Sequence, residues 1–138
     1  MNRGREQHTP VTGGCHCRRV RFEVMVGRKL TVHRCNCSIC ALTDFLHLIV
    51  PRDRFRLLGS DESLTEYRFN TGVARHWFCS VCGVKSFYLP RSHPDSYSVN
   101  LRCIDLPPDI VVTIEAFDGK NWEQNVGQLA SPDRQQGP

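Results

Sequence analysis

The sequence has no long apolar run and no apolar segment close to its N-terminus. A membrane-spanning helix needs about 20 consecutive apolar residues, and a secretory signal needs an apolar stretch that the opening "MNRGREQHTPVTGG" lacks. We therefore expect a cytoplasmic chain with no membrane partner. Structural disulfides are rare in that reducing compartment, so the eight cysteines favour metal binding.

The sequence also lacks a block of like charges. Its basic residues are spread out, among them Arg18, Arg19, Arg21, Arg52, Arg54 and Arg56. The formal net charge is +4. If seven of the cysteines were thiolates that bind two zinc ions, they would add seven negative and four positive charges, and the net charge would fall to +1. Nucleic acids are bound through gathered positive charge. We therefore do not expect a nucleic-acid partner.

No repeat, linker or low-complexity segment divides the 138 residues, which predicts a single domain. A hydrophobic fraction of 40% and a mean hydropathy of -0.37 are typical of a soluble globular protein. Residues 1–12 and 129–138 are polar and contain Gly, Pro and Gln, so we predict disordered tails around a domain at 13–128.

Short β-type segments follow one another about every ten residues. In "VRFEVMV" (20–26), apolar residues alternate with the period of a half-buried strand. Further strands are expected in 29–35, 45–51, 63–70, 74–79, 84–90, 96–104 and 111–119, with a hairpin turn at "NTG". Helix is expected only after Cys40 and within 118–129. The pattern predicts an all-β sandwich or barrel-like domain.

Seven of the cysteines fall into groups of two, three and two. Cys15 and Cys17 have a spacing that places both side chains on one face of a strand. Cys79 and Cys82 belong to "CSVCG", the C-x-x-C-G pattern of a zinc knuckle. Each pair supplies half of a tetrahedral site, so the four residues are candidate ligands of one structural Zn²⁺.

The middle group is Cys35, Cys37 and Cys40, in "CNCSIC". Three protein ligands and one open position are the arrangement of a catalytic zinc, so these cysteines are candidates for a second, reacting metal site. Two alternatives stay open: the three thiols are free or redox-active, or Cys103 is a fourth ligand that closes the site. Cys103 also fits a small buried residue in a strand.

Two histidines flank the triplet. His33 and His47 are candidates for proton transfer or metal ligation, although a strand histidine is more often simply packed and hydrogen-bonded. His16 is expected to point away from its two neighbouring ligands, and His76 and His93 have no context that assigns a role.

The ordered segments "GGCHC", "CNCSIC", "LIVP", "YRFNTG", "FCSVCGVKSFYLPRSHP", "VNLRCID" and "FDGKNWE" resemble the glutathione-dependent formaldehyde-activating enzyme (Gfa) family, also called the centromere protein V family. The resemblance covers about residues 13–124 and is stronger to the centromere protein V branch. It implies an all-β fold like that of the Mss4 protein. It also implies a structural zinc on Cys15, Cys17, Cys79 and Cys82, and an activity-linked zinc on Cys35, Cys37 and Cys40.

The resemblance further implies a reaction that joins formaldehyde to the thiol of glutathione. We therefore expect a zinc-dependent carbon–sulfur lyase-type enzyme that acts on small thiol adducts, with Arg34 or Arg91 as candidate cations for the anionic peptide. The alternative is a non-enzymatic zinc-binding module that binds a protein or nucleic acid. A fold alone does not choose between them, and nothing in the sequence indicates the oligomeric state.

Overall fold

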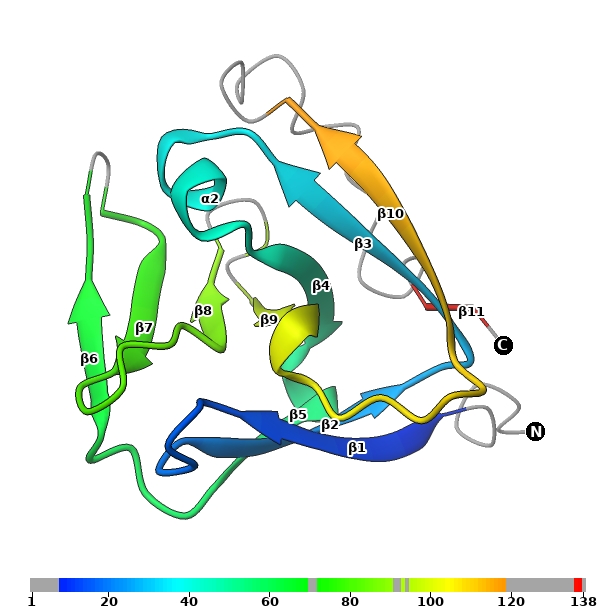
Figure 1. Cartoon of the computed structure of the whole chain (residues 1–138), viewed down its shortest axis with the longest axis horizontal. Coiled ribbons are helices and arrows are strands. Elements are labelled where there is room, and N and C mark those ends of the chain that lie inside the picture. The colour runs from blue at the N-terminus through cyan, green and yellow to red at the C-terminus, as the bar shows by residue number, and fades with distance from the viewer. Residues whose placement is uncertain (1–7, 70–71, 91–92, 94, 119–135, 138) are drawn as a thin grey trace.

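The computed structural model describes residues 8–69, 72–90, 93, 95–118 and 136–137 of the chain. Its described elements are mostly strands arranged in two sheets (Figure 1), which confirms the all-β prediction. None of the helices in these residues is long and apolar enough to cross a membrane.

The smaller sheet contains three antiparallel strands in the order β1 (Thr9–Gly14), β2 (Arg21–Val26) and β5 (Phe55–Leu58). Within the described residues the larger sheet contains β3 (Lys29–Cys35), β4 (Leu46–Pro51), β6 (Leu64–Tyr67), β7 (Arg75–Cys79), β8 (Phe87–Leu89), β9 (Ser96–Asn100), β10 (Val111–Phe117) and β11 (Gln136–Gly137). Their order is β10-β3-β4-β9-β8-β7-β6, with β11 also paired to β3. The predicted hairpin is confirmed, because β6 and β7 pair antiparallel.

The helices are short and lie where the chain changes direction. The α-helix α2 (Ser38–Thr43) follows β3, and the 3-10 helices η1 (Arg52–Arg54) and η2 (Leu101–Cys103) follow β4 and β9. In Figure 1 the end of β3 and α2 lie high, whereas the ends of β1 and β7 lie low. The cysteine groups that these ends carry therefore lie apart in this view.

One core lies between the two sheets. The alternation predicted for "VRFEVMV" is confirmed, since Val20, Phe22, Val24 and Val26 are at most 2% exposed. All five residues of β4 from Leu46 to Val50 are buried, as a strand covered on both faces requires. Cys15 and Cys79 belong to this same core cluster, so two of the predicted ligands are built into the centre of the fold.

The predicted boundaries need three corrections. The N-terminal tail does not extend to residue 12, because β1 begins at Thr9, pairs with β2 and buries Val11. At the other end, Gln136–Gly137 pair with β3, so that part of the predicted tail forms a strand. The strand predicted at 96–104 ends at Asn100, whose side chain caps η2. The helix predicted within 118–129 lies, beyond residue 118, outside the described residues.

Candidate functional site

The structure brings the first predicted set of cysteines together. The sulfur atoms of Cys15, Cys17, Cys79 and Cys82 all lie within 4.8 Å of one another, although 62 positions separate Cys17 from Cys79. Cys17 Sγ is 3.6 Å from both Cys15 Sγ and Cys79 Sγ. Four sulfurs bound tetrahedrally at about 2.3 Å from one zinc would be roughly 3.8 Å apart. The cluster therefore fits a metal ion with four thiolate ligands.

The C-x-C pair does not lie on a strand, which corrects the prediction from its spacing. Cys15 follows the end of β1, and Cys17 lies in the turn that comes next. The Cys15 amide donates to the carbonyl oxygen of Val20 at 3.0 Å, and the Val20 amide donates to Cys15 Sγ at 3.3 Å. Arg18 takes a left-handed conformation, with φ of 70°, to close this loop. The pair is thus held by a second knuckle.

The "CSVCG" segment forms the knuckle that the sequence predicts. The amides of Val81 and Cys82 both lie 3.4 Å from Cys79 Sγ, and the Gly83 amide donates to the Cys79 carbonyl at 2.8 Å. Gly83 has a φ of 79°, a conformation that glycine adopts without a steric penalty. Backbone N–H groups, first that of Cys17 and then that of Val84, lower the pKa of Cys82 to about 6. Amides directed at sulfur favour thiolates, the form that binds metal.

The second predicted set also converges. Cys35 ends β3, Cys37 is the N-cap residue of α2, and Cys40 lies inside that helix. The three sulfurs lie within 4.8 Å of one another. Cys35 and Cys37 do not share a strand, because the chain leaves β3 at Cys35 and turns into α2. The Cys37 amide lies 3.5 Å from Cys35 Sγ across this turn.

The three thiols of the triplet affect one another's ionisation strongly. Hydrogen bonds from Cys35 and then Cys40 lower the pKa of Cys37 to about 2, whereas the neighbouring cysteine thiols and burial raise the pKa of Cys40. The two neighbouring thiols therefore stabilise the thiolate of Cys37, and this negative charge opposes the ionisation of a second thiol. A cation among the sulfurs removes this opposition, so the donor set fits a metal ion.

The two clusters differ in burial. In the first cluster Cys15 and Cys79 are 4% and 1% exposed and pack in the core, and Cys17 and Cys82 are partly exposed and pack against it. In the triplet only Cys40 is buried, and Cys35 borders an open cleft of about 600 Å³. The lining of the cleft is Arg34, Cys35, Asn36, Ala41, Asp44, Ala116, Phe117 and Asp118. A small molecule can therefore approach the triplet without opening the fold.

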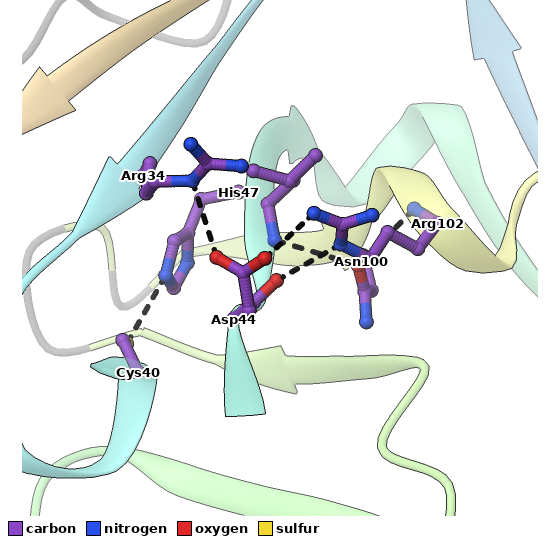
Figure 2. Close-up of polar contacts among 7 residues, drawn as sticks. Arg34, Cys40, Asp44, His47, Asn100 and Arg102 are labelled. Carbon is purple, nitrogen blue, oxygen red and sulfur yellow. Dashed lines mark hydrogen bonds and ion pairs between the residues drawn. The ribbon is translucent and has the colours of Figure 1, made fainter. Parts of the chain in front are cut away.

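Asp44 fastens the helix of the triplet to the rest of the fold (Figure 2). It is the C-cap of α2 in a left-handed conformation, and its amide donates to the Cys40 carbonyl at 2.8 Å. Its carboxylate accepts from Arg34 Nε at 3.1 Å and from Arg102 Nη2 at 2.7 Å. Arg102 Nε also donates to the Asp44 carbonyl at 3.1 Å. The end of α2 is thus tied to β3 and to η2.

His47 is the histidine that contacts the triplet. Its Nε2 lies 3.1 Å from Cys40 Sγ, and its Nδ1 lies 3.0 Å from Ser98 Oγ and 3.2 Å from Tyr88 Oη. Burial and then the Lys85 ammonium lower the pKa of His47 to about 3, so the ring is neutral near pH 7.

The other flanking histidine, His33, is paired with His47 in the β3–β4 register. Its Nε2 lies 3.8 Å from a carboxylate oxygen of Glu115.

Sequence reasoning missed a cluster of aromatic and basic residues beside the triplet. Phe45 and Tyr88 pack against His47, with ring centroids 4.7 and 5.6 Å away, and His76 stacks on Tyr88 at 4.7 Å. Lys85 Nζ lies 4.1 Å from the centroid of the Tyr88 ring. The only signal in the sequence was the position of "VKSFY" directly after the knuckle, since the approach of β4 to β8 depends on the fold.

The remaining candidate residues are one cysteine and two arginines. Cys103 is not part of the triplet, and its pKa is raised to about 11, first by burial and then by the thiols of Cys15 and Cys82, which places it beside the first cluster. The alternative in which Cys103 closes the triplet as a fourth ligand is therefore not supported. Arg34 lies on the cleft, paired with Asp44. Arg91 lies outside the described residues.

Two comparisons with known proteins find similar ones. The family model described as glutathione-dependent formaldehyde-activating enzyme matches residues 10–120. The crystal structure of a Rhodobacter sphaeroides protein is similar, with a TM-score of 0.62 and 31% sequence identity over 74% of this chain and 99% of that chain. Both of the cysteine clusters described above lie inside the matched residues.

Proposed function

Because this chain belongs to the glutathione-dependent formaldehyde-activating enzyme family, we propose that it is a zinc-dependent enzyme that joins formaldehyde to the thiol of glutathione. The observation that supports this most is the contrast between the two cysteine clusters. Four sulfurs form a closed set in which Cys15 and Cys79 belong to the core and Cys17 and Cys82 pack against it, whereas three form an incomplete set at the edge of an open cleft. The first arrangement suits a structural metal and the second suits a metal that acts on a ligand.

Zinc is the metal that we propose for both clusters. Thiolate ligands favour Zn²⁺ over Mg²⁺ or Ca²⁺. Cys15, Cys17, Cys79 and Cys82 would hold one ion, and Cys35, Cys37 and Cys40 would hold the other. At the triplet, a bound zinc would supply a Lewis acid that lowers the pKa of a thiol at its open position.

The residues of the cleft suit a charged peptide thiol. Glutathione carries two carboxylates and one ammonium group, and the cleft offers the Arg34 guanidinium for a carboxylate and the Asp118 carboxylate for the ammonium. These groups would bind and orient the peptide so that its sulfur reaches the Cys35 side of the triplet. The chain would thereby raise the local concentration of thiolate beside the aldehyde.

In the reaction, the thiolate sulfur attacks the carbonyl carbon of formaldehyde and a carbon–sulfur bond forms. The π electrons of the carbonyl move to oxygen, which takes a proton and gives S-hydroxymethylglutathione. His47 does not supply this proton, because its pKa near 3 leaves it neutral at physiological pH. Its role is to contact Cys40 and fix the triplet. Water in the open cleft supplies the proton.

The experiment must separate catalysis from the spontaneous reaction of formaldehyde with thiols. We would measure adduct exchange at equilibrium by NMR with ¹³C-formaldehyde and glutathione, over a range of enzyme concentrations. Saturable acceleration is expected, together with its loss in a folded Cys37→Ser variant. Cys103→Ser is the matched control, because Cys103 lies outside both clusters. Exchange at the spontaneous rate with metal-loaded enzyme would contradict the proposal.

A further inference from the structure

We infer that Lys85 is a second reactive group of this site, an amine that captures small aldehydes reversibly as an imine beside the cysteine triplet. The inference rests on the proposed function only for the thiol that finally accepts the carbon. Aldehyde capture by Lys85 itself can be tested without any thiol.

The position of Lys85 connects it to the triplet through a short chain of contacts. Its Nζ lies over two aromatic rings, 4.1 Å from the centroid of Tyr88 and 5.0 Å from that of Phe45. These same rings pack against His47, whose Nε2 lies 3.1 Å from Cys40 Sγ. The amine therefore lies in the cluster that supports the reacting cysteines.

The partners of Lys85 are unusual for a half-buried lysine. Such a cation is normally paired with a carboxylate, because desolvation of an unpaired charge is costly. Among the described residues Lys85 forms no ion pair with an acidic side chain, and its Nζ instead lies 2.6 Å from Nδ1 of His76. Burial and then Lys85 itself lower the pKa of His76 to about 4, so this partner is a neutral ring near pH 7.

Desolvation favours the neutral, nucleophilic form of this amine, whereas the two rings and the His76 acceptor stabilise its ammonium form. Burial lowers the pKa of Lys85 to about 8, although the thiols of Cys40 and Cys37 act in the opposite direction. An exposed lysine amine is almost fully protonated at pH 7, whereas a pKa near 8 leaves roughly a tenth of the amine neutral. A desolvated lysine with a lowered pKa is the kind of amine that enzymes use to form imines with carbonyl substrates.

The chemistry balances without an oxidant or reductant. The amine lone pair forms a bond to the carbonyl carbon, the π electrons move to oxygen, and oxygen takes a proton to give a carbinolamine. Loss of this hydroxyl as water gives a protonated imine, which remains a cation over the Tyr88 and Phe45 rings. A thiol adds to the imine carbon to form the carbon–sulfur bond. Water then cleaves the carbon–nitrogen bond, which releases the S-hydroxymethyl adduct of the thiol and restores the amine.

Reductive trapping tests the capture step directly. The metal-loaded protein would be treated at pH 7 with limiting ¹³C-formaldehyde and sodium cyanoborohydride, which reduces imines to methylated amines, and the labelled lysines would be mapped by mass spectrometry. The chain has only three lysines, at positions 29, 85 and 120, so the assignment is simple. Lys29 is an exposed residue of β3 and serves as the internal reference.

We expect the label on Lys85 to form faster than that on Lys29 by at least roughly tenfold, because more of its amine is neutral. Accessibility alone predicts the reverse, since Lys29 is the exposed residue. Equal labelling, or faster labelling of Lys29, would overturn the inference.

A Lys85→Arg variant tests whether the imine contributes to turnover. Arginine keeps the cation above the rings but does not form this imine. The variant should keep its metal content and thiol binding while its adduct formation slows by at least roughly tenfold, and Lys29→Arg should match the wild type. Full acceleration by Lys85→Arg would show that the imine is not an intermediate of the reaction, and the proposed thiol chemistry would still stand. Labelling of Lys85 without any acceleration by the wild type would support the capture site while contradicting the proposed function.

Discussion

Cys40 and His47 meet through their side chains, with the sulfur 3.1 Å from Nε2 of the ring. This contact links the cysteine triplet to buried hydroxyl groups of β8 and β9, since the opposite nitrogen of His47 lies close to Ser98 Oγ and Tyr88 Oη. The ring has its partners on both sides and is held neutral by burial. Its position suits the support of a metal ligand.

We predict that His47→Asn weakens metal binding at the triplet by about 10- to 100-fold, the usual effect of losing a group that supports a ligand. Asparagine can place a polar atom near the Nδ1 position, but it has no atom near the Nε2 position that contacts Cys40. Competition with a chromogenic chelator measures the affinity. Glutamine at the same position reaches towards the Nε2 site, so His47→Gln should recover part of the loss. Equal affinities for both variants and the wild type would show that the contact is only packing.

Replacement of Asp44 should affect the triplet more than the fold. Its ion pairs with Arg34 and Arg102 are about half exposed, and such pairs contribute at most about 1 kcal/mol to stability. Asparagine tolerates the left-handed backbone found here. Asp44→Asn should therefore keep the free energy of unfolding within about 1 kcal/mol of the wild type and release the second metal faster to a chelator. Asp61→Asn, at an exposed position away from the cleft, is the control that should change neither.

The two clusters should respond differently to loss of one thiol. Cys79→Ser removes a ligand inside the core, and we expect it to lower the free energy of unfolding by several kcal/mol, because structural zinc binding contributes directly to folding. Cys37→Ser, at the start of α2, should cost much less. Urea denaturation of both variants measures the difference. A larger loss for Cys37→Ser would reverse the roles that we assign.

Acid should destabilise the protein through His76. Its pKa is lowered from 6.5 to about 4, first by burial and then by Lys85. Between these values the unfolded chain binds a proton that the folded chain does not bind. The contribution of His76 is therefore fully present above pH 6.5 and is lost as the pH falls towards 4.

His76→Phe keeps a ring beside Tyr88 but removes this titration. Its free energy of unfolding, measured by urea denaturation, should fall less than that of the wild type between pH 7 and pH 5. Acid acts on the cysteines of both proteins alike, so the difference between them isolates His76. His76→Leu, which lacks the ring, should be less stable throughout and show the same reduced dependence. Identical pH dependence in all three proteins would contradict the prediction.

Local sequence pattern predicted much of the β structure. The strand predicted at residues 29–35 has those bounds, and the alternation in "VRFEVMV" gave the buried face correctly. The first strand was missed because "TPVTGG" carries only Val11 into the core and otherwise has the composition of a tail. Pairing with β2 supplies the hydrogen bonds that order it. Composition alone contains no information about that partner.

The cysteine sets were predictable, but their local geometry was not. A spacing of two fits a strand and also a tight turn, and the choice at Cys15 depends on its hydrogen bonds with Val20. Lys85 was not predictable as part of the site. It lies near the triplet because β8 and β9 pair and β9 pairs with β4, which brings the Tyr88 ring beneath it against His47. Such long-range pairings leave no local signal.

We propose that four cysteines hold a structural metal and that three hold a metal that reacts. Graded chelation of the wild-type protein tests this division, with zinc content, circular dichroism and glutathione binding measured at each step. The closed cluster, which has Cys15 and Cys79 in the core, should release its metal only when the domain unfolds, whereas the triplet beside the cleft can exchange its metal in the folded state. We predict that mild chelation removes one zinc per chain and abolishes glutathione binding while the dichroism spectrum stays native. Loss of both metals in a single step together with unfolding would contradict the account.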